Sequence, residues 1–400
     1  MAPAARGLAL AALAAVVGGC ATHGETPSVP WLIAANIRSL AGFPPTPPDF
    51  YKEPVRVSDG LKFTAITAGF EHTCALTIDG DTYCWGSNQY DQLGNGELTE
   101  TCARGTIGCS STPVRLEGAP RFTALAASMH GTCGLDASGR AHCWGDVFGA
   151  VPVEIPGGHA FVTLDSSPSG QLTCGLTAAG QAWCWGLKPP DGGGPYFLSG
   201  PDPVSASSAF AYIDVGGEHG CGIDAAGNAS CWGANQFGQL GAGVSGLEGG
   251  VSESLVPVPV EGGLELALVA SASSYSCGLD TTGALHCWGR GFPGDGYRRV
   301  PDRRTIAHGA RPVRLWTTDP TWAEMRAGSL DTCGLSGDGE LYCFTATPTA
   351  RDRRPRRVDS DEAFVAFTVG TGHACAIGED AFAYCWGRSD RGQVGRPPER

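Results

Sequence analysis

The sequence predicts an all-β fold built from seven repeated units. Its 400 residues include 60 Gly and 28 Pro, and only 17% are charged, a composition typical of turn-rich β proteins rather than helical ones. Fourteen of the 17 cysteines form seven pairs, each with nine residues between its members. The pairs recur at intervals of 41 to 59 residues, a period that indicates a repeat array.

The spacing within each pair fits a β-hairpin with a three-residue loop. Such a loop ends on a residue in the left-handed region, normally Gly. With Gly80 in that place, Thr77 pairs with Asp81 and, counting outward, Cys74 with Cys84. This is a non-hydrogen-bonded position, where Cα atoms lie about 4.5 Å apart, at the short end of the disulfide range. Six units carry the equivalent glycine, and the seventh has Ala381 instead.

The cysteines therefore predict a disulfide framework. Without Cys20 their number is even, as expected in an oxidising compartment. The predicted bonds are Cys74–Cys84, Cys133–Cys143, Cys174–Cys184, Cys221–Cys231, Cys277–Cys287, Cys333–Cys343 and Cys375–Cys385, with Cys102–Cys109 as the remaining pair. A structural zinc site is disfavoured, because its cysteines stand two to four residues apart.

The N-terminus is typical of an exported, lipid-anchored protein. Arg6 precedes the apolar stretch Leu8–Val17, which is too short to cross a bilayer. Val17-Gly18-Gly19-Cys20 resembles a bacterial lipobox, which implies a signal peptide over 1–19 and acylation of Cys20. The alternative is an ordinary signal peptide that leaves Cys20 as an unpaired thiol. Residues 20–53 end in a Pro-rich stretch and are expected to form a semi-rigid tether.

A longer motif surrounds the cysteine pairs. It reads Gly69-Phe-Glu-His72-Thr-Cys74, then Cys84-Trp85-Gly86 and Asn88-Gln-Tyr-Asp-Gln92-Leu93-Gly94, and it returns around Cys221 and Cys231 and more loosely after Cys385. These units resemble repeats of the regulator of chromosome condensation family, in a bacterial cysteine-rich version. The resemblance covers residues 54 to 395 and implies a seven-bladed β-propeller with four-stranded blades, here assigned to 54–396 with a tail at 397–400. The tryptophans after the second cysteines are interpreted as packing residues between adjacent sheets.

A Pro-initiated strand precedes every cysteine pair, as at Pro54-Val55 and Pro113-Val114, and none follows Gly395. If each blade combines a Trp-Gly segment with the next Pro-Val strand, the last blade lacks its outer strand. We expect Pro54–Val57 to supply it and to close the ring, which covers two sheet edges.

No catalytic, metal or cofactor site is predicted. His72, His219 and His373 recur two residues before a first cysteine, but other units hold Gly131, Tyr275 or Asp331 there. A structural hydrogen bond is the interpretation we adopt for these histidines, with a ring-facing ligand site as the alternative. Gly289–Gly294 matches GxGxxG only formally, because it follows a strand end and opens no helix.

Charge excludes one class of partner and suggests another. The formal charge of −13 argues against a nucleic-acid binder. Residues 288–357 nevertheless hold 13 Arg against 8 acidic residues. The arginines cluster in equivalent connections of units five and six: Arg298, Arg299, Arg303, Arg304, Arg351, Arg353, Arg354, Arg356 and Arg357. They form either a basic patch for an anionic partner or solvated loops without a partner.

The sequence alone thus favours a monomeric, non-enzymatic binding scaffold of the bacterial cell envelope. It would be held in the membrane only by its lipid, on the periplasmic or exposed side of the outer membrane, and would present loops to a protein or anionic glycan. One alternative is guanine-nucleotide exchange, as in the family's namesake, which the predicted disulfides oppose. Another is an envelope hydrolase or lyase, which a clustered pair of carboxylates in one loop face would support, and none is visible in the sequence.

Overall fold

The computed structural model describes residues 50–96, 101–102, 106–188, 197–292, 297–299, 305–318, 321–345 and 354–395. The chain divides into two units, Met1–Thr46 and Pro47–Arg400, and all described residues belong to the second. Cys20, the predicted signal peptide and most of the predicted tether therefore lie outside the described residues, as does the tail at 397–400. In the part of the chain that is described, no helix has the length and apolar character needed to span a bilayer.

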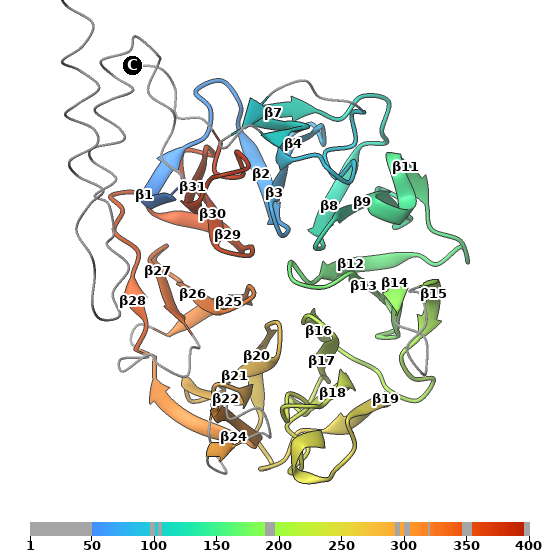
Figure 1. The fold of residues 1–400 in the computed structure, drawn as a ribbon, viewed down its shortest axis with the longest axis vertical. Helices are drawn as coiled ribbons and strands as arrows, with labels where there is room; N and C mark the ends of the chain where they lie inside the picture. Colours follow the sequence, from blue (N-terminus) through green and yellow to red (C-terminus); the bar gives the residue numbers. More distant parts are fainter. Residues whose placement is uncertain are drawn as a thin grey trace, which may run out of the picture. The chain divides into compact units, whose positions relative to one another are not determined.

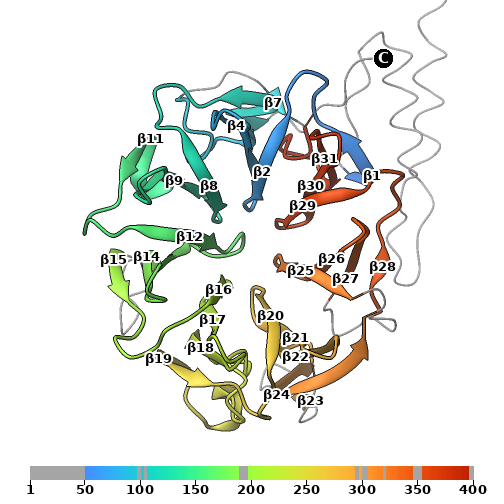
Figure 2. The same ribbon diagram turned by 180° about the vertical axis from the view of Figure 1, so that it is seen from behind.

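The second unit is a seven-bladed β-propeller (Figure 1). We number the blades by their cysteine pairs, so that Cys74–Cys84 marks blade 1 and Cys375–Cys385 marks blade 7. Each blade is an antiparallel sheet whose strands, A to D, run from the centre of the ring outward. Figure 2 shows the same order from behind, with A strands such as β2, β8 and β12 innermost.

The strand bounds repeat from blade to blade. Blades 1 and 2 contain β2 (Phe63–Ala68), β3 (His72–Thr77), β4 (Thr82–Ser87) and β7 (Cys109–Arg115), then β8 (Phe122–Ala127), β9 (Gly131–Asp136), β10 (Ala141–Gly145) and β11 (Gly149–Glu154). Blades 3 and 4 contain β12 (Phe161–Ser166), β13 (Leu172–Thr177), β14 (Ala182–Lys188) and β15 (Phe197–Pro203), then β16 (Tyr212–Val215), β17 (His219–Ile223), β18 (Ala229–Ala234) and β19 (Glu253–Pro259).

The remaining blades follow the same plan. Blade 5 contains β20 (Leu266–Ser271), β21 (Tyr275–Asp280), β22 (Ala284–Arg290) and β24 (Thr305–Thr317), with β23 (Tyr297–Arg299) added outside β24; blade 6 contains β25 (Trp322–Ala327), β26 (Asp331–Ser336), β27 (Leu341–Thr345) and β28 (Arg356–Arg357). Blade 7 contains β29 (Phe364–Val369), β30 (His373–Gly378) and β31 (Ala383–Arg388). A separate hairpin, β5 (Thr101–Cys102) and β6 (Thr106–Ile107), and two short 3₁₀ turns, η2 (Asp146–Phe148) and η3 (Gly246–Glu248), lie in the connections.

The N-terminal strand closes the ring as expected, but it begins earlier. β1 (Phe50–Arg56) is the outer strand of blade 7 and pairs with β31. Residues 50–53, assigned from the sequence to the tether, belong to this strand, because Phe50 and Tyr51 pair with Arg388 and Gly387. The register shifts between Tyr51 and Val55, around Pro54, which has no N–H to donate to the ladder.

The hairpins have the predicted register. Cys74 pairs with Cys84, the Thr77 N–H donates to Asp81 O, and Gly80 adopts a left-handed conformation with φ of 78°. All eight expected disulfides are present, and the seven hairpin bonds have Cα–Cα distances of 4.0–4.1 Å. In blade 7, Ala381 takes the left-handed position with φ of 67°, although L residues with a Cβ disfavour it.

The core lies between blades rather than in one centre. One face of blade 1 places Ala75 and Trp85 against Cys375 and Ile377 of blade 7, while the other places Leu76 against Trp144 of blade 2. Trp85, Trp144 and Trp288 are completely buried. The indole N–H of each donates to a backbone carbonyl of the preceding blade, at Gln393, Gln92 and Gln239 respectively. The tryptophans are therefore packing residues at blade junctions.

Candidate functional site

The A strands line the centre of the ring, and each has one edge without a neighbouring strand. An unpaired strand edge exposes backbone N–H groups that need acceptors. The position on each A strand that pairs with the first cysteine is equivalent in all blades. It holds Thr67, Ala126, Asp165, Asp214, Ala270, Arg326 and Thr368 in blades 1 to 7.

Four of these side chains cap the next blade. The Oγ1 of Thr67 accepts from the Ala127 N–H at 2.9 Å, and Thr368 does the same for the Ala68 N–H at 3.0 Å. In blades 3 and 4 a carboxylate replaces the hydroxyl. Asp165 Oδ2 accepts from the Val215 N–H at 2.5 Å. Asp214 Oδ1 accepts from the Ser271 N–H. The two aspartates are thus neighbours at one side of the ring and satisfy backbone donors.

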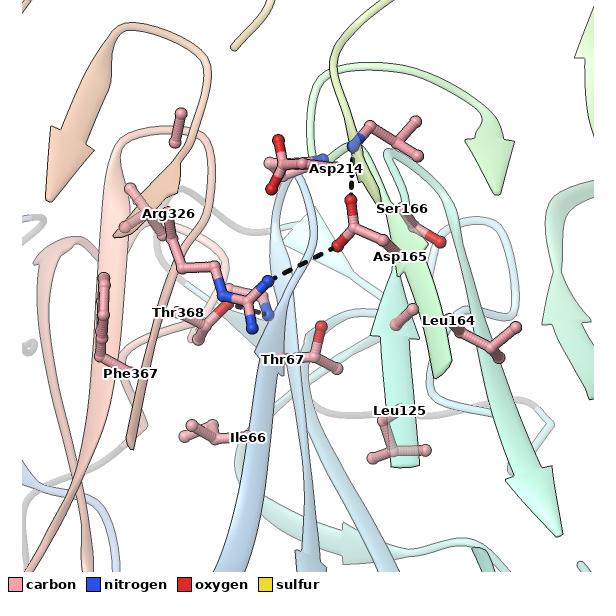
Figure 3. A pocket seen from close by; sticks show the side chains of 16 residues that line it. Ile66, Thr67, Leu125, Leu164, Asp165, Ser166, Asp214, Arg326, Phe367 and Thr368 are labelled. Atoms are coloured by element: carbon pink, nitrogen blue, oxygen red, sulfur yellow. Dashed lines mark hydrogen bonds and ion pairs between the residues drawn. The ribbon is translucent and has the colours of Figure 1, made fainter. Parts of the chain in front are cut away.

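Arg326 faces these carboxylates from blade 6 (Figure 3). Its Nη1 lies 4.0 Å from Asp165 Oδ1 and 3.3 Å from the Tyr212 hydroxyl, to which it donates. The Tyr212 hydroxyl in turn lies 3.5 Å from Asp214 Oδ2. Glu324 accepts from Arg326 Nε at 3.0 Å and lies 2.9 Å from its Nη2. Blades 3, 4 and 6 therefore share one polar network across the ring.

Burial makes these carboxylates hard to ionise. Desolvation raises the pKa of Asp214 to about 6, although Arg326 opposes the shift. Desolvation, followed by the negative charge of Asp214, also raises the pKa of Asp165 well above its ordinary range. Ionisation of Asp214 therefore makes ionisation of Asp165 harder.

The network lines a cavity of about 100 Å³. Ile66, Leu125, Leu164 and Phe367 form apolar parts of its wall. The connection between β12 and β13 crosses the ring and lines the cavity with Pro168, whose carbonyl accepts from the Thr371 hydroxyl of blade 7 at 3.2 Å. A cavity of this size is far smaller than the 300 to 1,000 Å³ typical of drug-sized ligand pockets.

The histidines of the repeated motif lie at blade junctions, away from this network. His72, His219 and His373 are buried, and their Nε2 atoms lie 2.8–3.0 Å from hydroxyls of the next blade, on Thr132, Ser276 and Thr73. The Ser276 hydroxyl donates to Gln239 O, so His219 Nε2 is the donor in its pair. In blade 5, Tyr275 occupies the histidine position and its hydroxyl lies 2.9 Å from Thr332 Oγ1.

These histidines are held neutral. Desolvation lowers the pKa of His72 and of His219 to about 3, and that of His373 to about 4. Among the residues described, no group of three or more His, Cys, Asp or Glu side chains is arranged to hold a metal ion. A neutral, hydrogen-bonded imidazole between two blades is a structural element, as the sequence interpretation favoured.

The two ends of each blade differ strongly. The B–C hairpins are short in every blade, from residues 78–81 in blade 1 to 379–382 in blade 7. The C–D connections, at the opposite end, run over 88–108 in blade 1, only 146–148 in blade 2 and 235–252 in blade 4. Loops of varied length on a rigid scaffold are where binding residues concentrate. This loop face, defined by the A–B and C–D connections, is the second candidate site.

The predicted arginine cluster is placed only in part. Arg298 and Arg299 lie in β23 of blade 5, and Arg356 and Arg357 in β28 of blade 6. Arg354, Arg356 and Arg357 are exposed, and Arg357 Nε donates to Glu340 Oε1 at 2.8 Å. Arg303, Arg304, Arg351 and Arg353 lie outside the described residues. The glutamate neutralises part of the predicted patch.

The sequence analysis did not predict the polar network of Asp165, Asp214 and Arg326. Asp214 and Arg326 each stand seven residues before a first cysteine, like Thr67, but Asp165 stands nine before Cys174. Its A–B connection is longer, which hides the equivalence. The sequence did contain a usable signal. When the units are aligned on their first cysteines, Asp214 and Arg326 fall at a position where the other units carry Ala, Ser or Thr.

Comparisons with known proteins agree with this architecture. Residues 63–92 and 79–135 match models described as "Regulator of chromosome condensation (RCC1) repeat". The mouse secretion-regulating guanine nucleotide exchange factor is 29% identical over 184 residues, which cover 42% of this chain and 39% of that protein. The ultraviolet-B receptor of Arabidopsis thaliana is 34% identical over 65 residues, or 16% of this chain and 15% of the receptor. The chain thus spans well under half the length of these relatives.

Solved structures with the same fold include two that cover most of the chain. Prp20p from Saccharomyces cerevisiae superposes with a TM-score of 0.60 over 82% of both chains, at 19% identity. Human WBSCR16 superposes with a TM-score of 0.64 over 84% of this chain and 89% of its own, at 15% identity. At such identities the likeness concerns the fold alone.

Proposed function

Because the chain belongs to the RCC1 repeat family of β-propellers, we propose that it is a non-enzymatic binding scaffold whose loop face recognises a protein or an anionic glycan. One observation carries the proposal: the C–D connections differ from blade to blade while the opposite hairpins stay uniform. Selection for fold alone gives no reason for that difference, whereas a binding surface does. Prp20p is described as having binding properties to Gsp1p and histones, so a propeller of this fold can bind proteins.

We extend the proposal to the cell envelope. Eight disulfides in one chain suit an oxidising compartment outside the cytosol. Acylation of Cys20 would hold the protein at the membrane, and the lipid would be its only membrane contact. The arginines of blades 5 and 6 would steer an anionic partner toward one side of an otherwise acidic protein.

The disulfides also weigh against the main alternative, guanine-nucleotide exchange. The mouse relative has that activity in its name, but a partner GTPase in a reducing cytosol would not meet a disulfide-bonded propeller. A hydrolase is disfavoured on other grounds. Asp165 and Asp214 stand on A strands of two blades rather than in one loop face, and both cap backbone N–H groups. Their cavity of about 100 Å³ also has no room for a sugar ring and its neighbours.

The proposal is tested by reversing charge at one end of the ring at a time. The loop variant replaces Arg351, Arg353 and Arg354, which stand in the C–D connection of blade 6, by Glu. The control variant replaces Lys62 and Arg121 by Glu; both are exposed, and they lie beside Phe382 and Gly80 of the B–C hairpins of blades 7 and 1. Exposed charges contribute little to stability, so both variants should fold. With an envelope fraction of the source cells, the loop variant should lose salt-sensitive capture of its partner and the control should keep it.

Equal capture by the wild-type chain and the loop variant, with the same salt dependence, would show that the arginines have no part in binding. Loss of capture in the control alone would move the binding site to the hairpin end of the ring.

A further inference from the structure

The cavity at the centre of the ring is surrounded by more acidic groups than its one arginine, Arg326, can neutralise. Arg326 is engaged by Glu324 through both Nε and Nη2, and it stays 4.0 Å from Asp165, beyond direct hydrogen-bond range. Asp165, Asp214 and Glu324 therefore share this one cation, and the two aspartates also accept from the backbone N–H groups that they cap. A buried carboxylate pair without a matching cation is costly.

The rest of the wall is apolar and reachable by solvent. Ile66, Leu125, Leu164 and Phe367 line the same cavity as the carboxylates (Figure 3). The side chain of Asp165 is 20% exposed and that of Arg326 is 36% exposed, so solvent reaches this end of the cavity, whereas Asp214 lies deeper and is buried. A site that combines two carboxylates with an aliphatic wall matches a group with a cationic head and a short apolar stem.

We propose that this cavity binds one primary alkylammonium group, with its N–H donors directed to Asp165 and Asp214 and its alkyl stem along the apolar wall. The group belongs either to a small free amine or to a lysine side chain of a partner. An ammonium supplies three donors, which suits two carboxylates at one end of a small cavity. The cavity meets the loop face through Pro168 of an A–B connection, but none of the arginines changed in the loop variant lines it, so the two proposals are tested by different variants.

The geometry disfavours other ligands. A divalent metal would need a third protein ligand, and no such group occurs among the described residues. A quaternary ammonium has no N–H to donate. Protons compete with the ammonium, because the pKa of Asp214 is raised to about 6 and that of Asp165 is raised well above its ordinary range. Tyr212, Glu324 and Arg326 are the other charged or titratable groups of the network. Binding should therefore release a proton and weaken in acid.

The test is calorimetric titration of the full chain with n-butylammonium chloride at about pH 7.5 and about pH 5, at constant ionic strength. Butan-1-ol and tetramethylammonium chloride serve as ligand controls, since one lacks the charge and the other lacks the N–H donors. Nα-acetyl-lysine N-methylamide reports on a lysine side chain. We expect butylammonium to bind, both ligand controls to fail, and affinity to fall by about tenfold or more at the lower pH.

Two variants locate the site. Asp165→Asn and Asp214→Asn keep an oxygen for the backbone N–H but lose the charge, and each should weaken butylammonium binding by about tenfold or more. Asp280→Asn is the control: this carboxylate caps the Thr282 and Ala284 N–H groups of a B–C hairpin and does not line the cavity, so its loss of charge should leave butylammonium binding intact. If Asp214→Asn does not fold, butylammonium binding by Asp165→Asn and the pH dependence of binding still test the proposal.

Binding of the free amine but not of the capped lysine identifies a small amine, and the reverse identifies a partner's side chain. The proposal is overturned if butan-1-ol binds as well as butylammonium, if both aspartate variants bind like the wild-type chain, or if no amine binds at either pH.

Discussion

The two ends of each blade obey different rules. At the B–C end, every blade closes with a short hairpin and a disulfide, and in six of the seven a glycine occupies the left-handed position. At the C–D end, the connection is three residues long in blade 2 and extends over 88–108 in blade 1. The hairpin end is fixed by backbone geometry that every blade must satisfy. The loop end is free of that constraint, so it is where one blade can differ from another in what it binds.

The comparison predicts that changes to the repeated frame alter stability, whereas changes at the loop end alter binding. The largest effect is expected from strand β1. Deleting residues through Val57 would remove the outer strand of blade 7 and the side chain of Val57, which is buried against Trp85 and Val394. Lost burial and hydrogen bonds should cost about 4 kcal/mol or more.

A truncation that ends before Phe50 is the control for this deletion, and it should unfold like the intact chain in urea. Coincident urea midpoints for the two truncations would show that β1 does not close the ring.

The next largest loss of stability is expected from replacing a buried histidine. His219→Ala would leave a cavity between blades 4 and 5 and remove the donor to Ser276. We expect a loss of about 3 kcal/mol in the free energy of unfolding. Glu218, its exposed neighbour, provides the control, since Glu218→Ala should change that free energy by less than about 0.5 kcal/mol. A similar loss in both variants, measured by chemical denaturation, would argue against a specific junction.

Acid should loosen the frame through the same histidines. Their folded-state pKa values, about 3 and about 4, lie below the ordinary 6.5, so the unfolded state takes up protons first. The free energy of unfolding should therefore decline as pH falls below about 6.5, by about 2 kcal/mol per histidine at about pH 5. Asp214 acts in the opposite sense, because its pKa is raised from 3.8 to about 6, and it offsets part of this loss between those values.

His219→Gln separates the two contributions. Glutamine can still donate a hydrogen bond but does not titrate. The variant should be less stable than the wild-type chain at about pH 8 and should show a shallower decline of stability between about pH 6.5 and 5. An unchanged slope in denaturation curves across this range would assign the acid sensitivity to other groups.

The smallest frame effect concerns the one hairpin without glycine. Ala381 occupies a left-handed position with φ of 67°, so Ala381→Gly should raise the free energy of unfolding by about 1 kcal/mol. The reverse change in blade 3, Gly180→Ala, should lower it by at least as much, because a Cβ there would stand 2.8 Å from Phe210 O. Thermal unfolding of both variants checks the signs, and a destabilised Ala381→Gly would contradict the account.

Much of the frame could be predicted because it follows from local rules. The cysteine spacing and Gly80 define the hairpin register, and the Pro-Val segments mark the outer strands, including the closing one. The start of β1 at Phe50 could not be predicted in this way. Pro54 resembles the first residue of the strand in the sequence, whereas the pairing continues to Phe50 beyond a register shift.

The polar network of Asp165, Asp214 and Arg326 could not be predicted from such local rules. Asp165 and Arg326 are brought together by closure of the ring, and no local periodicity relates two such distant residues. The raised pKa values likewise arise from desolvation in the assembled channel, which composition does not report. The sequence likewise does not identify a partner for the loop face, because recognition depends on the chemistry of both surfaces.

The central claim, that the loop face contacts the partner, is tested most directly by site-specific photo-crosslinking in intact cells. A photoreactive residue would replace Tyr90, Val147 or Val244 at the loop end, or Ile78 at the hairpin end, all of which are exposed. If the loop face binds the partner, we expect crosslinked adducts of one partner from the loop-end positions and none from Ile78. Adducts from Ile78 alone, or equal adducts from both ends, would contradict it.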